Sequence, residues 1–344
     1  MDENNKLQTN MQTSNIDTEG NVLFLDEDRL NRKEVGFPPH KNKPNGLGIY
    51  NFILEHFLYM RKSLWPLALK LYHFFIKYSA WMKKGGLKSK IYKRGIMIAP
   101  VMEAHTSTIV MPLDIDITDK SEKVVIPMDM LKESLKHTSY IAGMDSCLCR
   151  DATDCKDYPK NVACLFLGEG GKTVVKHKLG RQFTYEEACN RIDEAAASGL
   201  MAQAVWIEVE QMLWGIRNDH MDKFLEVCFC CPCCCIAMRL ARNAEPEDRI
   251  RFHPSGWTAV PNQTKCIGCR KCAAGPHGCP VEAISFNTDG LVQINQELCV
   301  GCGICKTRCP EDVISIKQTM PMRVDLHDYF AKDYNLDIKI WDNH

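Results

Sequence analysis

The sequence predicts an α+β protein with a mainly helical, cysteine-rich N-terminal domain and a small C-terminal domain made of two similar halves. Nineteen of its 344 residues are cysteine, and ten of them crowd into short stretches before residue 240. Helix-forming and helix-capping patterns dominate the same region. Between residues 265 and 318 one cysteine motif occurs twice, which indicates a compact domain with internal symmetry.

The composition indicates a folded protein that holds metal rather than disulfides. Hydrophobic residues make up 45% of the chain, charged residues 25%, and the formal net charge is zero, so no electrostatic field favours nucleic acid as a partner. The opening stretch MDENNKLQTNMQTSN has no apolar run of the kind that a secretory signal needs. We therefore expect a cytoplasmic protein, in which thiols stay reduced. Adjacent cysteines are also poorly placed to bond with each other.

The first 90 residues divide into two segments. Residues 1–46 are polar and are expected to form a flexible arm. Residues 47–90 are rich in aromatic and aliphatic side chains, and Pro66 is expected to separate two amphipathic helices. Lysine and arginine interrupt every apolar run, so we expect no membrane span. Two expectations stay open for these helices: packing on the protein itself or on a partner protein, or peripheral contact with the inner face of a membrane.

Residues 91–255 are expected to form the cysteine-rich domain. Thr184 and Glu187 form a capping-box pattern before an alanine-rich run, and Gly199 stands where a glycine commonly ends a helix. We expect helices over residues 128–136, 185–198 and 205–226.

The repeated motif lies in residues 256–320, and the tail 321–344 follows it. Its second half reads Cys299-x2-Cys302-x2-Cys305-x3-Cys309-Pro310, and its first half reads Cys266-x2-Cys269-x2-Cys272-x6-Cys279-Pro280. Three thiolates at two-residue intervals fit one tight loop around one face of an iron–sulfur cube, whereas the fourth lies too far along to close the same cube. The apolar residues at 284–286 and 314–316 are expected to form short strands.

This segment resembles the two-[4Fe–4S] ferredoxin domain of bacteria. The resemblance implies that each cluster takes three cysteines from one half of the motif and one from the other. One cluster would be held by Cys266, Cys269, Cys272 and Cys309, and the other by Cys279, Cys299, Cys302 and Cys305. The alternative is a pair of zinc knuckles, but zinc sites need neither the third cysteine at the same interval nor the Cys-Pro pair.

Ten further cysteines are candidate metal ligands in the domain over residues 91–255. They are Cys147, Cys149, Cys155, Cys164, Cys228, Cys230, Cys231, Cys233, Cys234 and Cys235. Thiolates at this density select iron–sulfur clusters, zinc or copper(I). We expect them to meet around one or two further iron–sulfur clusters, of cubane or non-cubane type, with a zinc or copper store as the alternative. Arg150 would bring positive charge to the site, whereas Cys189 is expected to be a buried thiol.

The whole chain resembles a group of iron–sulfur proteins of anaerobes. In these proteins a CxCR segment, a central helix and a CxCCxCCC run precede a two-cluster ferredoxin tail. The corresponding stretches here are CLCR, EEACNRIDEAAASGL and CFCCPCCC. The resemblance implies an architecture and no particular activity.

The function expected from these motifs is electron transfer. Motifs for nucleotide phosphates, dinucleotides and zinc peptidases are absent from the sequence, so we expect a redox partner, either a flavoprotein or a larger oxidoreductase complex. The leading hypothesis is a protein or subunit that relays low-potential electrons through three or more clusters. Two alternatives stay open: a reductase whose N-terminal open or non-cubane cluster reduces a small substrate, and a redox or metal sensor.

Overall fold

The computed structural model describes most of the chain from Met60 onward. The described stretches are residues 60–83, 86–96, 106–113, 127–207, 213–216, 218–243, 252–319, 326–330 and 338–341. The arm expected over residues 1–46 lies outside them, as do residues 47–59 and most of the expected tail 321–344.

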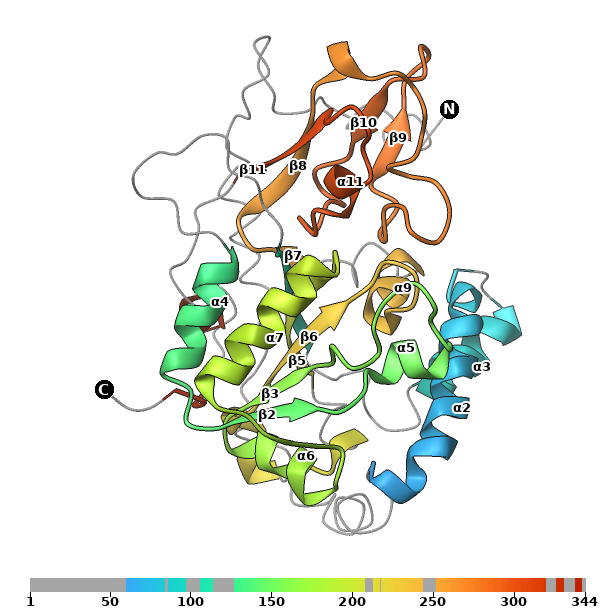
Figure 1. Ribbon diagram of the computed structural model, residues 1–344. Helices are drawn as coiled ribbons and strands as arrows, with labels where there is room; N and C mark the ends of the chain where they lie inside the picture. The colour runs from blue at the N-terminus through green and yellow to red at the C-terminus, as the bar shows by residue number, and fades with distance from the viewer. Residues whose placement is uncertain are drawn as a thin grey trace, which may run out of the picture.

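A mixed seven-stranded sheet forms the centre of the cysteine-rich domain (Figure 1). Its strand order is β4-β2-β3-β6-β5-β1-β7, and all neighbours are antiparallel except β1 and β7. The strands are β1 (Thr106–Pro112), β2 (Ile141–Met144), β3 (Leu165–Leu167), β4 (Gly180–Gln182), β5 (Met201–Ile207), β6 (Leu225–Cys230) and β7 (Phe252–Pro254). Successive side chains of a strand point to opposite faces. Different structural elements therefore pack on the two faces of this sheet.

Two helices cover one face of the sheet. They are α4 (Pro127–Lys136) and α7 (Tyr185–Ala197), which lie side by side in Figure 1. Ala188 and Ile192 of α7 are fully buried in the same apolar cluster as Ala204 of β5. The helices and the sheet therefore form two layers around the main core.

The remaining helices lie beside the sheet and at its other face. They are α2 (Trp65–Lys77), η7 (Ser79–Trp81), α3 (Gly86–Ile96), α5 (Leu148–Ala152), α6 (Lys172–Lys176), α9 (Ile236–Asn243) and the single turn α12 (Leu326–Asp328). Pro66 stands in the first turn of α2, where its missing N–H group costs no hydrogen bond. The indole Nε1 of Trp65 donates to Asp151 Oδ2 at 2.9 Å, so α2 is anchored on α5.

Most local expectations of helix are confirmed, and one is wrong. The expected helices at 128–136 and 185–198 are α4 and α7, and Thr184 and Glu187 make both hydrogen bonds of the capping box. The helix expected over 205–226 is wrong, because β5 runs to Ile207 and β6 begins at Leu225. The α+β class is confirmed, and the cysteine-rich domain contains more sheet than the sequence indicated.

The C-terminal domain is built from short strands around a second core. Its elements are β8 (Trp257–Pro261) paired with β11 (Ile314–Gln318), β9 (Ile284–Phe286) paired with β10 (Val292–Ile294), and α11 (Ile304–Thr307). The strands expected at 284–286 and 314–316 are therefore confirmed. Val110 and Met201 of the large sheet belong to this second core, so the two domains share buried side chains.

Candidate metal centres

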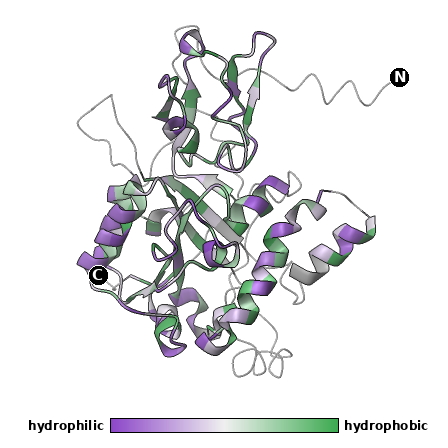
Figure 2. Cartoon of the chain, turned by 45° about the vertical axis from the view of Figure 1, so that its right-hand side comes forward, coloured by the Kyte–Doolittle hydropathy of each residue, from purple (hydrophilic) through white to green (hydrophobic). Residues whose placement is uncertain are grey.

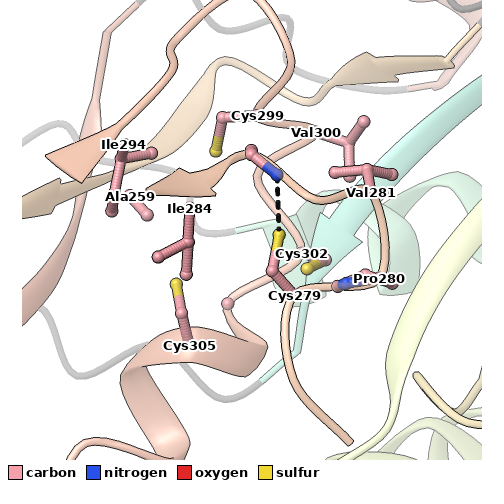
Figure 3. A pocket seen from close by; sticks show the side chains of 12 residues that line it. Ala259, Cys279, Pro280, Val281, Ile284, Ile294, Cys299, Val300, Cys302 and Cys305 are labelled. Atoms are coloured by element: carbon pink, nitrogen blue, oxygen red, sulfur yellow. Dashed lines mark hydrogen bonds between the residues drawn. The ribbon is translucent and has the colours of Figure 1, made fainter. Parts of the chain in front are cut away.

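A cavity in the C-terminal domain is lined by four cysteines and otherwise by apolar side chains (Figure 3). The cysteines are Cys279, Cys299, Cys302 and Cys305. Cys279 comes from the first half of the repeat and the other three from the second half, around the start of α11. Four soft sulfur donors facing one space are the ligand set of a [4Fe–4S] cluster.

A second cavity takes its four cysteines from the two halves of the repeat in the opposite proportion. Its cysteines are Cys266, Cys269, Cys272 and Cys309. Three come from the first half of the repeat, and Cys309 comes from the second half. The structure therefore brings together in space the two crosswise sets of cysteines named from the sequence. The donor set again fits a [4Fe–4S] cluster.

Two glycines let the cysteine loops turn tightly. Gly268 and Gly301 have φ angles of 67° and 68°, in the left-handed region that glycine adopts without strain. A Cβ atom on Gly301 would overlap the carbonyl oxygen of Trp257. Gly301 is therefore fixed both by its backbone angle and by its close contact with β8.

Backbone N–H groups are directed at the remote cysteine of each half. The N–H of Ala283 donates to Cys279 Sγ, and the N–H of Val313 donates to Cys309 Sγ, each over 3.3 Å (the first is dashed in Figure 3). Hydrogen bonds to ligand sulfur stabilise negative charge on a cluster and raise its reduction potential. The two halves of the repeat therefore share this hydrogen bond from a backbone N–H group to sulfur, as well as the spacing of their cysteines.

Burial keeps four of the thiols in these cavities protonated when no metal is bound. Desolvation is the largest cause that raises the pKa of Cys272, Cys279, Cys302 and Cys305. Metal binding needs thiolates, so binding at these cavities must release protons.

The ten candidate ligand cysteines of the cysteine-rich domain divide into two groups. We call the first the strand group; it contains Cys147, Cys149, Cys164, Cys228, Cys230 and Cys235. We call the second the turn group; it contains Cys155, Cys231, Cys233 and Cys234. Within the strand group, side-chain interactions link Cys147 to Cys149, Cys149 to Cys235, Cys235 to Cys230, Cys230 to Cys228, and Cys228 to Cys164.

The strand group lies on the sheet face that α4 and α7 leave uncovered. Cys228 and Cys230 alternate along β6, and they stand opposite Gln203 and Met201 of β5. Cys164 directly precedes β3, and its Sγ lies 3.2 Å from Cys228 Sγ. Neighbouring strands therefore present sulfur side by side on one face.

Arg150 places a positive charge between the two groups. Its side chain is fully buried, and Nη1 donates to the carbonyl oxygen of Phe229 at 2.8 Å while Nη2 donates to that of Val162. Burial opposes the charge, but the nearby Cys147 and Cys231 thiolates outweigh it and raise the Arg150 pKa. An arginine in this position stabilises an anionic metal–sulfur site.

Sequence analysis did not identify Glu226 or Gln203 as part of this site. Glu226 is 5% exposed, its Oε1 accepts a hydrogen bond from Cys228 Sγ at 2.8 Å, and its carboxylate lies within 4.8 Å of both Cys164 Sγ and Cys228 Sγ. Gln203 Nε2 donates to Cys235 Sγ at 3.4 Å. The signal for Glu226 was the spacing Glu-x-Cys-x-Cys, which places all three side chains on one face only if the segment is a strand.

The turn group is compact and lies near the C-terminal domain. Its four Sγ atoms are within 4.8 Å of one another. His277 reaches this group from the extra loop between Cys272 and Cys279, and its Nε2 lies 3.4 Å from Asp157 Oδ2. The side chains of Asp157, Cys233 and His277 also come within 4.8 Å of one another. The loop that lengthens the first half of the repeat therefore contacts the cysteine-rich domain.

Cys189 does not join either group. It lies in α7, it is half-buried rather than buried, and it is absent from the clustered ligand atoms found in the described part of the chain. The expectation that Cys189 would be buried is therefore wrong, and the expectation that it is not a metal ligand stays a prediction.

Comparison with known proteins identifies the C-terminal domain. Residues 259–316 match the family model described as a 4Fe-4S dicluster domain. The sequence is 33% identical over 106 residues to the B subunit of polysulfide reductase from Wolinella succinogenes (28% of this protein, 52% of that one). It is 32% identical over 92 residues to an uncharacterized ferredoxin of Methanocaldococcus jannaschii (26% and 52%) and 26% identical over 111 residues to hydrogenase-4 component A of Escherichia coli (32% and 51%).

The chain spans about half the length of these curated relatives. No solved structure matches it. Every helix in the described stretches is too short or too polar to span a membrane. These findings favour a ferredoxin-type [4Fe–4S] domain over zinc knuckles for residues 259–316, and iron–sulfur electron transfer is the chemistry of that domain.

Proposed function

We propose that this protein relays electrons between a redox donor and a partner oxidoreductase. The two cavities of the C-terminal domain would each bind a [4Fe–4S] cluster through the four cysteines that line them, and the strand group would bind a third iron–sulfur cluster. Such clusters supply one-electron transfer. The chain itself supplies the alignment, the burial and the charge of the three sites.

A continuous buried core between the sites is the observation that supports this relay most. One apolar cluster joins Cys230 and Cys235 of the strand group to Cys272, Cys299 and Cys305 of the C-terminal domain. Electron transfer through protein slows steeply with distance, so well-packed contact between redox sites favours it. The shared core holds the sites at a fixed separation.

Polar contacts support the same alignment. Arg242 of α9 donates from Nε to the carbonyl oxygen of Pro280 at 2.9 Å and from Nη2 to that of Cys279 at 3.3 Å. Helix α9 begins directly after Cys235. One short helix therefore connects the strand group to a cysteine of the first cavity.

We propose that the partner oxidoreductase lies at an anionic membrane surface, and that helices α2 and α3 of this protein bind to that surface. Residues 56–102 contain ten lysines and arginines and no acidic residue. The exposed apolar side chains of α2 and α3 are Leu67, Leu71, Phe74, Leu87 and Ile91. In Figure 2, hydrophobic and hydrophilic residues are interleaved along these helices. Basic charge combined with exposed apolar side chains is typical of helices that bind anionic lipid surfaces.

The first test of the relay is the metal and sulfide content of protein purified without oxygen. Three clusters predict about twelve irons and about as many sulfides per chain. Cys302→Ala should remove about four irons and the matching electron paramagnetic resonance signal. Cys228→Ala should remove the iron of the strand group and leave the two C-terminal clusters in place.

Cys189→Ser is the matched control, because this thiol lies outside both groups and both cavities. It should leave metal content and spectra unchanged. About eight irons per chain, with none lost in Cys228→Ala, would contradict the third cluster. Colourless protein without iron would contradict the relay as a whole.

A further inference from the structure

The turn group differs from the two cavities in the spacing of its sulfur atoms. In the described part of the chain, three sets of candidate ligand atoms come within 4.8 Å of one another, and none of them contains a cysteine of either cavity. The cavity cysteines instead surround a space. The Sγ atoms of the turn group lie close together instead: Cys233 Sγ is 3.9 Å from Cys155 Sγ and 3.4 Å from Cys234 Sγ.

These distances match the ligands of a single ion. A zinc–sulfur bond of about 2.3 Å in a tetrahedron places the sulfurs roughly 3.8 Å apart. In a cubane cluster each thiolate binds a different iron, so the four sulfurs are spread around the whole cube. The separations of 3.9 Å and 3.4 Å lie near this value, and all four Sγ atoms of the turn group lie within 4.8 Å of one another.

Two separate segments of the chain form this tetrahedron. Cys231, Cys233 and Cys234 lie on the tight turn after β6, which Pro232 helps to close. Cys155 follows α5, and its N–H donates to the carbonyl oxygen of Arg150 at 2.9 Å. The position of the turn is fixed independently of any metal, because Arg239 donates to the carbonyl oxygen of Cys233 from Nε at 3.2 Å and from Nη2 at 2.6 Å.

We propose that the turn group binds one divalent metal ion in a closed cage of four thiolates, and that it does not bind an iron–sulfur cluster. Zn²⁺ and Fe²⁺ both suit this soft tetrahedral donor set. With all four positions filled by protein, the site is structural. It ties the segment after α5 to the turn before α9, at the point where His277 of the C-terminal domain packs.

The test compares metal loss in turn-group variants with loss in cavity variants. Cys155→Ser and Cys234→Ser should each lower the metal content by about one zinc or one iron per chain, with acid-labile sulfide unchanged. Loss of zinc identifies the ion as zinc, and loss of one iron identifies it as ferrous iron. Both results support the single-ion site. Cys302→Ala should instead lose iron and sulfide together.

Two results would overturn the single-ion site. One is a loss of about four irons and about four sulfides in the turn-group variants, which would indicate a cluster. The other is unchanged metal content in soluble, folded variants. If the variants fail to fold, the metal and the acid-labile sulfide of the wild-type holoprotein can be compared instead. The wild-type holoprotein gives a second measurement, because a single ion adds one metal without sulfide: metal should exceed acid-labile sulfide by about one per chain, and equal amounts would also overturn the assignment. None of these readouts depends on whether the relay operates.

Discussion

Arg150 links the charge of the cysteine-rich domain to its metal content. Its guanidinium is fully buried, and its Nε has no hydrogen-bond acceptor in the described part of the chain. A buried cation is tolerated when opposite charge lies close to it. Bound metal keeps the surrounding sulfurs deprotonated. Loss of metal would leave fewer deprotonated sulfurs around Arg150 to balance its charge, so the metal-free domain should melt at a lower temperature than the metal-bound one.

His177 should make the stability of the fold sensitive to acid. Burial, followed by the charges of Lys176 and Arg61, lowers its pKa to about 4, below the ordinary value of about 6.5. The unfolded chain therefore binds the proton first as pH falls. Stability is complete above about pH 6.5 and is lost as pH drops toward 4. We expect His177→Gln to flatten the decline of melting temperature across this window.

His137→Gln is the control for that measurement, because the His137 side chain is 45% exposed. The melting temperature of the His137→Gln variant should decline with acid as steeply as that of the wild type. If His177→Gln also follows the wild-type curve between pH 6.5 and pH 4, burial of His177 does not contribute to acid sensitivity.

Strands β5 and β6 show where local sequence patterns mislead. The capping box of α7 is a local signal, and it predicted the start of that helix to the residue. β5 and β6 are central strands, bonded to other strands on both sides. β5 is largely apolar on both faces, and β6 is apolar on one face and carries Glu226, Cys228 and Cys230 on the other. Neither a simple polar alternation nor a helical period describes them. Pairing between distant segments decides their structure, and no single window of sequence reports it.

Helices α2 and α3 can be tested by flotation with lipid vesicles. Leu67 and Leu71 are 64% and 52% exposed on adjacent turns of α2. The double variant Leu67→Ser/Leu71→Ser should bind vesicles rich in anionic lipid roughly tenfold more weakly, because each leucine loses its apolar burial. Wild-type binding should fall with added salt and should be weak on zwitterionic vesicles.

Ile267→Ser provides a matched control, since Ile267 is also 64% exposed but lies in the C-terminal domain. It should leave vesicle binding unchanged. No binding to either kind of vesicle would indicate that a partner protein rather than a membrane covers these helices. Equal binding to anionic and zwitterionic vesicles would contradict the proposed role of the basic residues.

The candidate sites were predictable to different extents. The C-terminal cysteines could be sorted into two sets because their spacing is itself the signal, and the structure places each set around one cavity. The ten N-terminal cysteines could only be named. Their division into a strand group and a turn group follows from the strand–turn junction at residues 230–231 and from the approach of Cys155. That approach depends on chain folding over 78 residues, between Cys155 and Cys233.

Arg242 is the contact through which the two domains can be loosened selectively. Arg242→Met keeps most of the side-chain volume and removes the hydrogen bonds to Pro280 and Cys279. Hydrogen bonds from charged groups contribute about 1.5–3 kcal/mol, so amide exchange around residues 279–283 should become roughly tenfold to a hundredfold faster. Hydrogen exchange read by mass spectrometry measures this directly.

Arg308→Met is the matched change within the C-terminal domain, since Arg308 Nε donates to Lys271 O at 3.0 Å. It should leave exchange in α9 as it is in the wild type, whereas Arg242→Met should raise it. Unchanged exchange at residues 279–283 in Arg242→Met would show that apolar packing alone holds the domains together.

The core shared by the two domains has a kinetic consequence. A ferredoxin that diffuses must find its acceptor, so its rate depends on how much of each protein is present. Here Cys235 and Cys305 belong to one buried cluster of a single chain, and no encounter is needed. Electron exchange between the proposed cluster of the strand group and those of the C-terminal domain should be first order and insensitive to dilution, while salt and crowding should affect only the steps that load and unload the molecule.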